Sequence, residues 1–61
     1  MAAKFELYKD SAGEFRWRLR HENRNIIADS GEGYTTKANA INGIESVKEN
    51  APTAPIDDQT D

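Results

Sequence analysis

The segment Phe15–Arg20, F-R-W-R-L-R, alternates large apolar side chains with arginines at every position. Successive side chains of a β-strand point to opposite faces, so this pattern predicts a strand with one apolar face and one cationic face. The apolar face carries Phe15, Trp17 and Leu19, and the opposite face carries Arg16, Arg18 and Arg20. A row of three arginines could bind a polyanion, contact a partner chain or simply keep the strand solvated.

Two further runs have the composition of strands. Lys4–Lys9, K-F-E-L-Y-K, places Phe5 and Leu7 on one face, and the turn cluster that follows it predicts a hairpin with Glu14–Arg20. In that cluster Asp10 can accept backbone hydrogen bonds and Gly13 can adopt a positive φ. After an Asn-rich turn, 25–30 forms a third strand.

The third strand contains two adjacent isoleucines, Ile26 and Ile27. Neighbouring residues of a strand point to opposite faces, so one isoleucine is expected in the core beneath the helix. The other is expected on the second face, beside Tyr8 and the arginines.

One helix follows the strands. Thr35 or Thr36 supplies its N-cap, and Lys37–Asn50 carries one apolar stripe. The stripe consists of Ala40, Ile41, Ile44 and Val47. Gly43 lies inside the helix, where it is unfavourable relative to Ala and suggests close packing on the sheet. Asn50 is expected in the left-handed conformation at the C-terminus, with Pro52 ending the helix.

These elements predict an α+β domain over residues 1–52, in which a three-stranded antiparallel sheet carries one C-terminal helix on one face. The expected core combines Phe5, Leu7, Phe15, Trp17 and Leu19 with the helix stripe. Residues 53–61 are expected to be a disordered acidic tail, because they contain Asp57, Asp58 and Asp61 and almost no apolar residues. The tail accounts for the net charge of −3, so the rest of the chain is neutral.

The short length of the chain limits its core. A domain of 61 residues buries only about 60 % of its unfolded surface, and without cysteine it has no disulfide to reinforce it. The remaining means of reinforcement is association, so a homodimer that covers the free strand edges is expected. No run approaches the roughly 20 apolar residues of a membrane span, so a soluble, cytoplasmic protein without membrane contact is expected.

The pattern resembles the YegP-like family of small bacterial and archaeal domains of unknown function. The matching stretches, spread over about five-sixths of the chain, are F-E-L-Y-K-D, A-G-E-F-R-W-R-L-R, I-I-A-D-S-G-E-G-Y and T-K-A-N-A-I-N-G-I-E-S-V-K-E-N-A. The resemblance implies a β-β-β-α unit, present singly or as tandem copies, and no established activity. The sequence departs from this pattern at Asn23-Arg24-Asn25, where Asn-Gly is expected.

The motifs that could carry chemistry favour structural roles. The Gly31–Gly33 segment lacks the Gly-Lys-Ser/Thr of a phosphate loop, so it is interpreted as a strand-to-helix turn. His21 and Glu22 are neighbours in a turn and have no nucleophile to serve. A monomer of two thin layers is expected to have no room for a catalytic pocket. The protein is therefore predicted not to be an enzyme and to have no cofactor or metal site.

Two functions remain open for the arginine-bearing face. The favoured function is a homodimeric protein-interaction or structural module that could also bind another protein. In this module Arg16 and Arg18 pair with Glu6 and Asp29. The alternative is binding of single-stranded DNA or RNA by Arg16, Arg18 and Arg20. The candidate interface or polyanion face consists of Tyr8, Arg16, Arg18, Arg20, Arg24 and Ile27.

Overall fold

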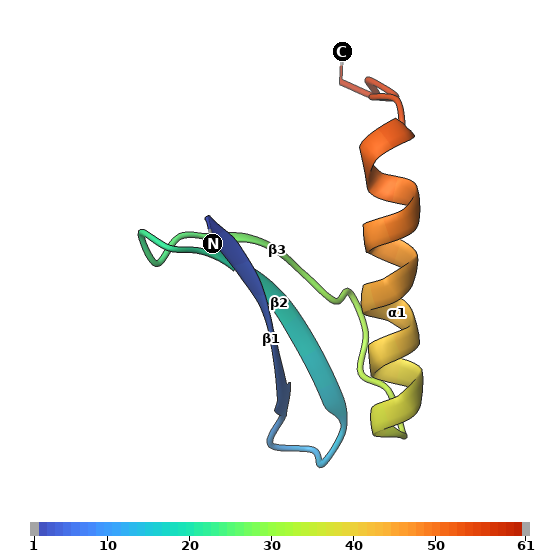
Figure 1. The fold of residues 1–61 in the computed structure, drawn as a ribbon. Helices are drawn as coiled ribbons and strands as arrows, with labels where there is room; N and C mark the ends of the chain where they lie inside the picture. Colours follow the sequence, from blue (N-terminus) through green and yellow to red (C-terminus); the bar gives the residue numbers. More distant parts are fainter. Residues whose placement is uncertain (1, 61) are drawn as a thin grey trace.

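The computed structural model describes residues 2–60 and has the predicted α+β architecture (Figure 1). The strands β1 (Ala3–Lys9), β2 (Phe15–His21) and β3 (Ile26–Asp29) form an antiparallel meander in the order β1-β2-β3. The helix α1 (Lys37–Asn50) follows, with a short 3₁₀ helix η1 (Ala51–Thr53) at its end. Asp61, which belongs to the predicted acidic tail, lies outside the described residues.

The hairpin between β1 and β2 is built as its turn residues predict. The carboxylate of Asp10 accepts hydrogen bonds from the backbone N–H groups of Ala12 and Glu14, both at 2.9 Å. Gly13 has a φ of +84°, a backbone conformation that is strained for any residue with a side chain. The register places Phe5 opposite Leu19, Glu6 opposite Arg18 and Leu7 opposite Trp17. The arginine row therefore continues directly across from Glu6 and Tyr8.

The core lies where α1 crosses β2. Trp17, Ala40 and Ile44 are buried, and a shell of partly buried side chains packs around them. The shell consists of Phe5, Leu7, Phe15, Tyr34 and Val47. The Trp17 ring meets the edge of the Phe5 ring with 5.7 Å between their centroids. Its indole N–H is buried without a hydrogen-bond partner among the described residues.

The predicted role of Gly43 agrees with the packing around it. A Cβ at this position would lie 2.6 Å from the Tyr34 hydroxyl oxygen and 3.2 Å from Trp17 Nε1. Both distances are shorter than ordinary van der Waals contact. Glycine therefore lets the helix approach the two aromatic side chains.

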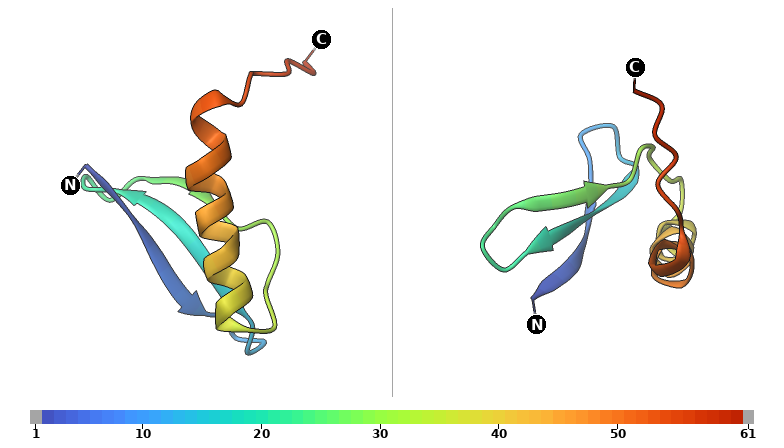
Figure 2. Two further views of the ribbon diagram at one scale, coloured as in Figure 1. Left: turned by 45° about the vertical axis from the view of Figure 1, so that its right-hand side comes forward. Right: turned by 90° about the horizontal axis from the view of Figure 1, so that it is seen from above.

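Two predicted core positions are wrong. Ile41 is 40 % exposed, because it lies one residue, or about a quarter turn, away from the line of Ala40 and Ile44. Leu19 is only partly buried and does not pack against the buried cluster. The structural reason is visible in Figures 1 and 2, where the strongly curved sheet diverges from α1 toward the β2–β3 turn.

The prediction that one isoleucine of the third strand enters the core is also wrong. Ile26 and Ile27 are 53 % and 56 % exposed. The register shifts beside them, so that Leu19 pairs with Ala28 and Arg20 with Ile26, and Ile27 is left without a partner. Because α1 contacts β2 and β1 and not β3, no helix covers either side chain.

The helix begins as predicted and ends differently. Thr36 is the N-cap, and its hydroxyl accepts a hydrogen bond from the Asn39 N–H at 3.1 Å. Asn50 is right-handed, with φ −99°, and not left-handed as predicted. Its side-chain amide donates to the Ser46 carbonyl at 2.9 Å, and the chain continues into η1, which contains Pro52. Residues 54–60 have no regular secondary structure and leave the helix away from the sheet (Figure 2).

Candidate functional site: the charged face of the sheet

The face of the sheet opposite α1 carries the candidate residues predicted from the sequence. Tyr8 on β1 and Arg16, Arg18 and Arg20 on β2 lie side by side on this face. Arg24 lies in the β2–β3 turn, and Ile27 is exposed on the edge strand β3. The structure thus brings the three strand arginines and Tyr8 together, whereas Ile27 lies at the edge.

Glu6 is the centre of this face. Its Oε1 accepts hydrogen bonds from Arg18 Nε at 2.8 Å and Arg20 Nε at 2.9 Å, and Lys4 Nζ lies 3.8 Å from its Oε2. The bond from Arg18, followed by that from Arg20, lowers the pKa of Glu6 from 4.5 to about 2. One carboxylate therefore holds cations from two strands and stays ionised at any physiological pH.

Arg16 has a different partner from the one predicted. Its Nε donates to Asp10 Oδ2 at 2.6 Å, and this bond lowers the pKa of Asp10 and raises that of Arg16. The expected ion pairs were to Glu6 and Asp29. Arg18 does pair with Glu6, whereas Asp29, although opposite Arg18 in the register, makes no ion pair among the described residues. The hairpin turn explains the difference, since it brings Asp10 within reach of Arg16.

Tyr8 is covered by an arginine. The Arg18 guanidinium carbon lies 4.7 Å from the centroid of the Tyr8 ring, which is the geometry of a cation–π contact. The other aromatic side chains of the two long strands, Phe5, Phe15 and Trp17, belong to the core or pack against it. The charged face therefore offers no free aromatic ring on which a base could stack.

An open groove of about 710 Å³ lies at one end of this face. It is lined by Ala3, Lys4, Glu6, Arg20, His21, Glu22 and Arg24. A monomer was expected to have no room for such a hollow, and this expectation is wrong, because the ends of β1 and β2 and the following turn border an open groove. Sequence reasoning treated His21 and Glu22 only as solvated turn residues and missed that they line a groove with Arg24.

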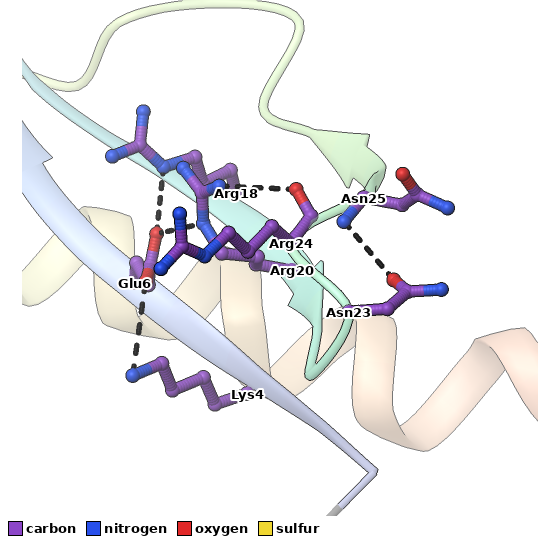
Figure 3. A network of polar contacts seen from close by, with 7 residues as sticks. All are labelled: Lys4, Glu6, Arg18, Arg20, Asn23, Arg24 and Asn25. Carbon is purple, nitrogen blue, oxygen red and sulfur yellow. Dashed lines mark hydrogen bonds and ion pairs between the residues drawn. The ribbon is translucent and has the colours of Figure 1, made fainter.

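Arg24 points into the same groove from the turn. Figure 3 shows the side chains of Lys4, Arg18, Arg20 and Arg24 directed toward Glu6. Arg20 Nη1 also donates to the Arg24 carbonyl at 3.1 Å, and Asn23 Oδ1 accepts from the Asn25 N–H at 3.1 Å. Arg24 itself has a φ of +76°, so the left-handed turn residue is the arginine and not an asparagine.

Within residues 2–60, no three acidic or histidine side chains are placed to hold a metal ion. In the same range no helix has the length and apolar character to cross a membrane.

Comparisons with known proteins agree on one family. Residues 10–58 match the domain of unknown function DUF1508. The protein Msl4696 of Mesorhizobium japonicum, named a UPF0339 protein, is 50 % identical over 98 % of this chain and all of its own length. A solution structure of a Haloferax volcanii protein superposes with a TM-score of 0.88 at 57 % identity, over 92 % of this chain and 93 % of its own. A UPF0339 protein of Stutzerimonas stutzeri, from the 5′ region of its ptx operon, is 54 % identical over 85 % of this chain. This chain spans only 46 % of that relative.

Proposed function

Since this chain belongs to the DUF1508/UPF0339 family, which as named has no assigned function, we propose from its own geometry that it is a self-associating protein-interaction module and not an enzyme. The YegP-like resemblance noted above concerns this same family. A second copy of the chain is the partner that we propose.

The distribution of the isoleucines carries the proposal. The chain has five isoleucines, and only Ile44 is buried. Ile26, Ile27 and Ile41 are 40 % to 56 % exposed, and Ile56 is 95 % exposed. Burying apolar surface is the main favourable term in folding, at about 25 cal/mol per Å². A small domain that leaves most of its isoleucines in water gains most from a partner that covers them.

The free strand edges support the same proposal. The Asp10 N–H donates to Glu14, and the Glu22 N–H donates to Ala2, so even-numbered residues of β1 bond to β2. The N–H and C=O groups of Phe5 and Leu7 therefore point to the open side of the sheet. An edge of this length invites pairing with another chain unless it is covered.

The length of the Stutzerimonas relative is consistent with two units in one chain. This chain spans 46 % of that relative, which leaves room there for a second unit of similar size. Two fused copies could reproduce within one chain the contact that we propose between two separate chains.

Binding of single-stranded nucleic acid is less well supported as the function. The three strand arginines are each held by Asp10 or Glu6, and Arg18 covers Tyr8. A stacking platform needs exposed aromatic rings beside free cations. We propose instead that these contacts brace the sheet.

Sedimentation at tens of micromolar tests the proposal, with Ile26→Thr/Ile27→Thr as the variant. Threonine keeps the β-branch that suits a strand but removes apolar area. We expect the parent to be dimeric and the dimer dissociation constant of the variant to be at least about tenfold higher. Glu45→Gln is the control, since it changes an exposed helix position without removing apolar area. A parent that sediments only at 6.8 kDa would refute self-association. The cytoplasmic location stays a prediction, which cell fractionation tests.

A further inference from the structure

The groove at the end of the charged face has more positive than negative charge. Lys4, Arg20 and Arg24 line it, Arg18 borders it, and only Glu6 and Glu22 oppose them. The local excess is about two positive charges, whereas the charges of residues 1–52 as a whole sum to zero. An anion entering the groove would therefore meet several cations from three different segments.

The arginines are already held in position before any ligand binds. The side chains of Arg18 and Arg20 are only 33 % and 27 % exposed, and Glu6 fixes both through Nε. These contacts use one nitrogen of Arg18 and, with the bond to the Arg24 carbonyl, two of Arg20. The remaining N–H groups can donate to a ligand without the entropy loss of ordering a flexible side chain.

Arg24 adds an independent observation. A residue with a Cβ is disfavoured at a φ of +76°, and glycine would adopt this conformation freely. The turn nevertheless holds an arginine, and its side chain extends toward Glu6, which lines the groove with it (Figure 3). Backbone strain of this kind clusters at functional positions and persists where the surrounding structure compensates for it.

We propose that this groove binds the phosphate group of a small phosphorylated molecule. A phosphate monoester carries a charge of about −1.5 to −2 at neutral pH, which matches the local excess. Guanidinium groups bind phosphate oxygens through paired N–H donors. A volume of about 710 Å³ suits a small ligand. The proposal goes beyond self-association, because the groove lies within one copy of the chain.

The test is a titration followed by amide NMR, with inorganic phosphate and glucose 6-phosphate as probes and chloride at equal ionic strength as the control. We expect saturable shifts confined to residues 3–6 and 20–24. Arg24→Gly should weaken binding about tenfold while raising the melting temperature, because glycine relieves the positive φ. Arg16→Gln is the matched control on the same face, since Arg16 is held by Asp10 outside the groove, and it should leave the affinity unchanged.

Several results would overturn the proposal. Equal shifts with chloride and phosphate would show general ionic strength effects only. Equal weakening by Arg16→Gln and Arg24→Gly would show a diffuse charge effect without a site. Tighter binding of a mixed-sequence single-stranded RNA, with shifts along Arg16–Arg20, would assign the face to nucleic acid instead. None of these results depends on whether the chain dimerises, so failure here is distinguishable from failure of self-association.

Discussion

The two faces of the sheet are held by different physical forces. On the face toward α1, Trp17 packs against Ala40 and Ile44, and apolar burial provides the stabilisation. On the opposite face, Glu6 and Asp10 hold three arginines through charged hydrogen bonds. Both faces are formed by the alternating residues of β2. The odd-numbered side chains from Phe15 to Leu19 point to the apolar face, and the arginines between them point to the charged face.

The two faces therefore differ in how much they stabilise the fold and in how strongly their contribution depends on pH and salt. Burial of a large aromatic side chain contributes several kcal/mol and depends little on pH or salt. Partly exposed ion pairs contribute little, and they weaken when salt screens them or when the carboxylate is protonated. The helix-facing side should therefore decide whether the chain folds, and the charged side should decide how the folded chain responds to its solution.

The largest expected effect is that of Trp17→Ala. The substitution removes the centre of the core and leaves a cavity, which should lower the free energy of unfolding by about 3 to 5 kcal/mol. Urea denaturation followed by far-UV circular dichroism measures the loss. Arg16→Gln, the adjacent position on the opposite face, is the comparison. If the two substitutions were equally destabilising, the two faces would not differ as described.

Gly43→Ala should have a smaller effect, of about 1 to 2 kcal/mol in the destabilising direction. Alanine favours a helix over glycine, but its Cβ would meet the Tyr34 hydroxyl and Trp17. Gly31→Ala is the matched control, because a Cβ at Gly31 has no atom within 4 Å. Thermal unfolding measures the melting temperatures of both variants. A Gly43→Ala protein that is more stable than the parent would contradict the close packing of Gly43 against Tyr34 and Trp17.

The substitution Glu6→Gln tests how the charged face makes stability depend on pH. The pKa of Glu6 is lowered from 4.5 to about 2 by Arg18 and Arg20, so its contribution to stability is full above about 4.5. It is lost as the pH falls toward 2. The parent should therefore lose stability over that range more steeply than Glu6→Gln. Urea midpoints between pH 2 and 6 test this, with Glu45→Gln on the exposed helix face as control; parallel curves for parent and Glu6→Gln would exclude the effect.

The smallest expected effect is that of deleting 54–61. Ile56 is 95 % exposed, and the described hydrogen bonds of this segment are local, such as that from the Thr60 N–H to Asp58. Removing it should change the free energy of unfolding of a monomer by no more than about 0.5 kcal/mol. Dilute samples measure the free energy of unfolding of the monomer alone. A larger loss of stability that occurs only in concentrated samples would show that the segment contributes to the dimer.

Much of the fold was predictable because short-range patterns determine it. The alternation of Phe15–Arg20 defined a strand and its two faces, and the stripe of Lys37–Asn50 defined the helix with its observed limits. The wrong predictions concern Ile26, Ile27, Ile41 and Leu19. Those on Ile26, Ile27 and Leu19 assumed that the helix covers the whole sheet, and sequence periodicity does not specify how far a curved sheet stays in contact with a helix. The prediction for Ile41 made the apolar stripe of the helix too wide, since the buried line runs through Ala40 and Ile44.

The candidate site was predictable only in part. The sequence placed Arg16, Arg18 and Arg20 on one face, and the cross-strand pairing of Arg18 with Glu6 followed from the same alternation. The partner of Arg16 and the groove around Arg24 did not follow. Both depend on where turns place side chains, and a turn's path is set by a few backbone angles that no repeating pattern reports.

The sequence by itself determined the element order, the identity of the two faces of β2 and the absence of cysteine as a reinforcement. These properties depend on residue spacing and composition, which folding does not change. Only the tertiary structure decided that Ile26 and Ile27 remain exposed and that three cations contact one carboxylate. Sheet curvature and the bulge at Ile27 arise from the pairing of different strands, and the left-handed Arg24 arises from the backbone angles of one turn. Neither is reported by a repeating pattern of residues.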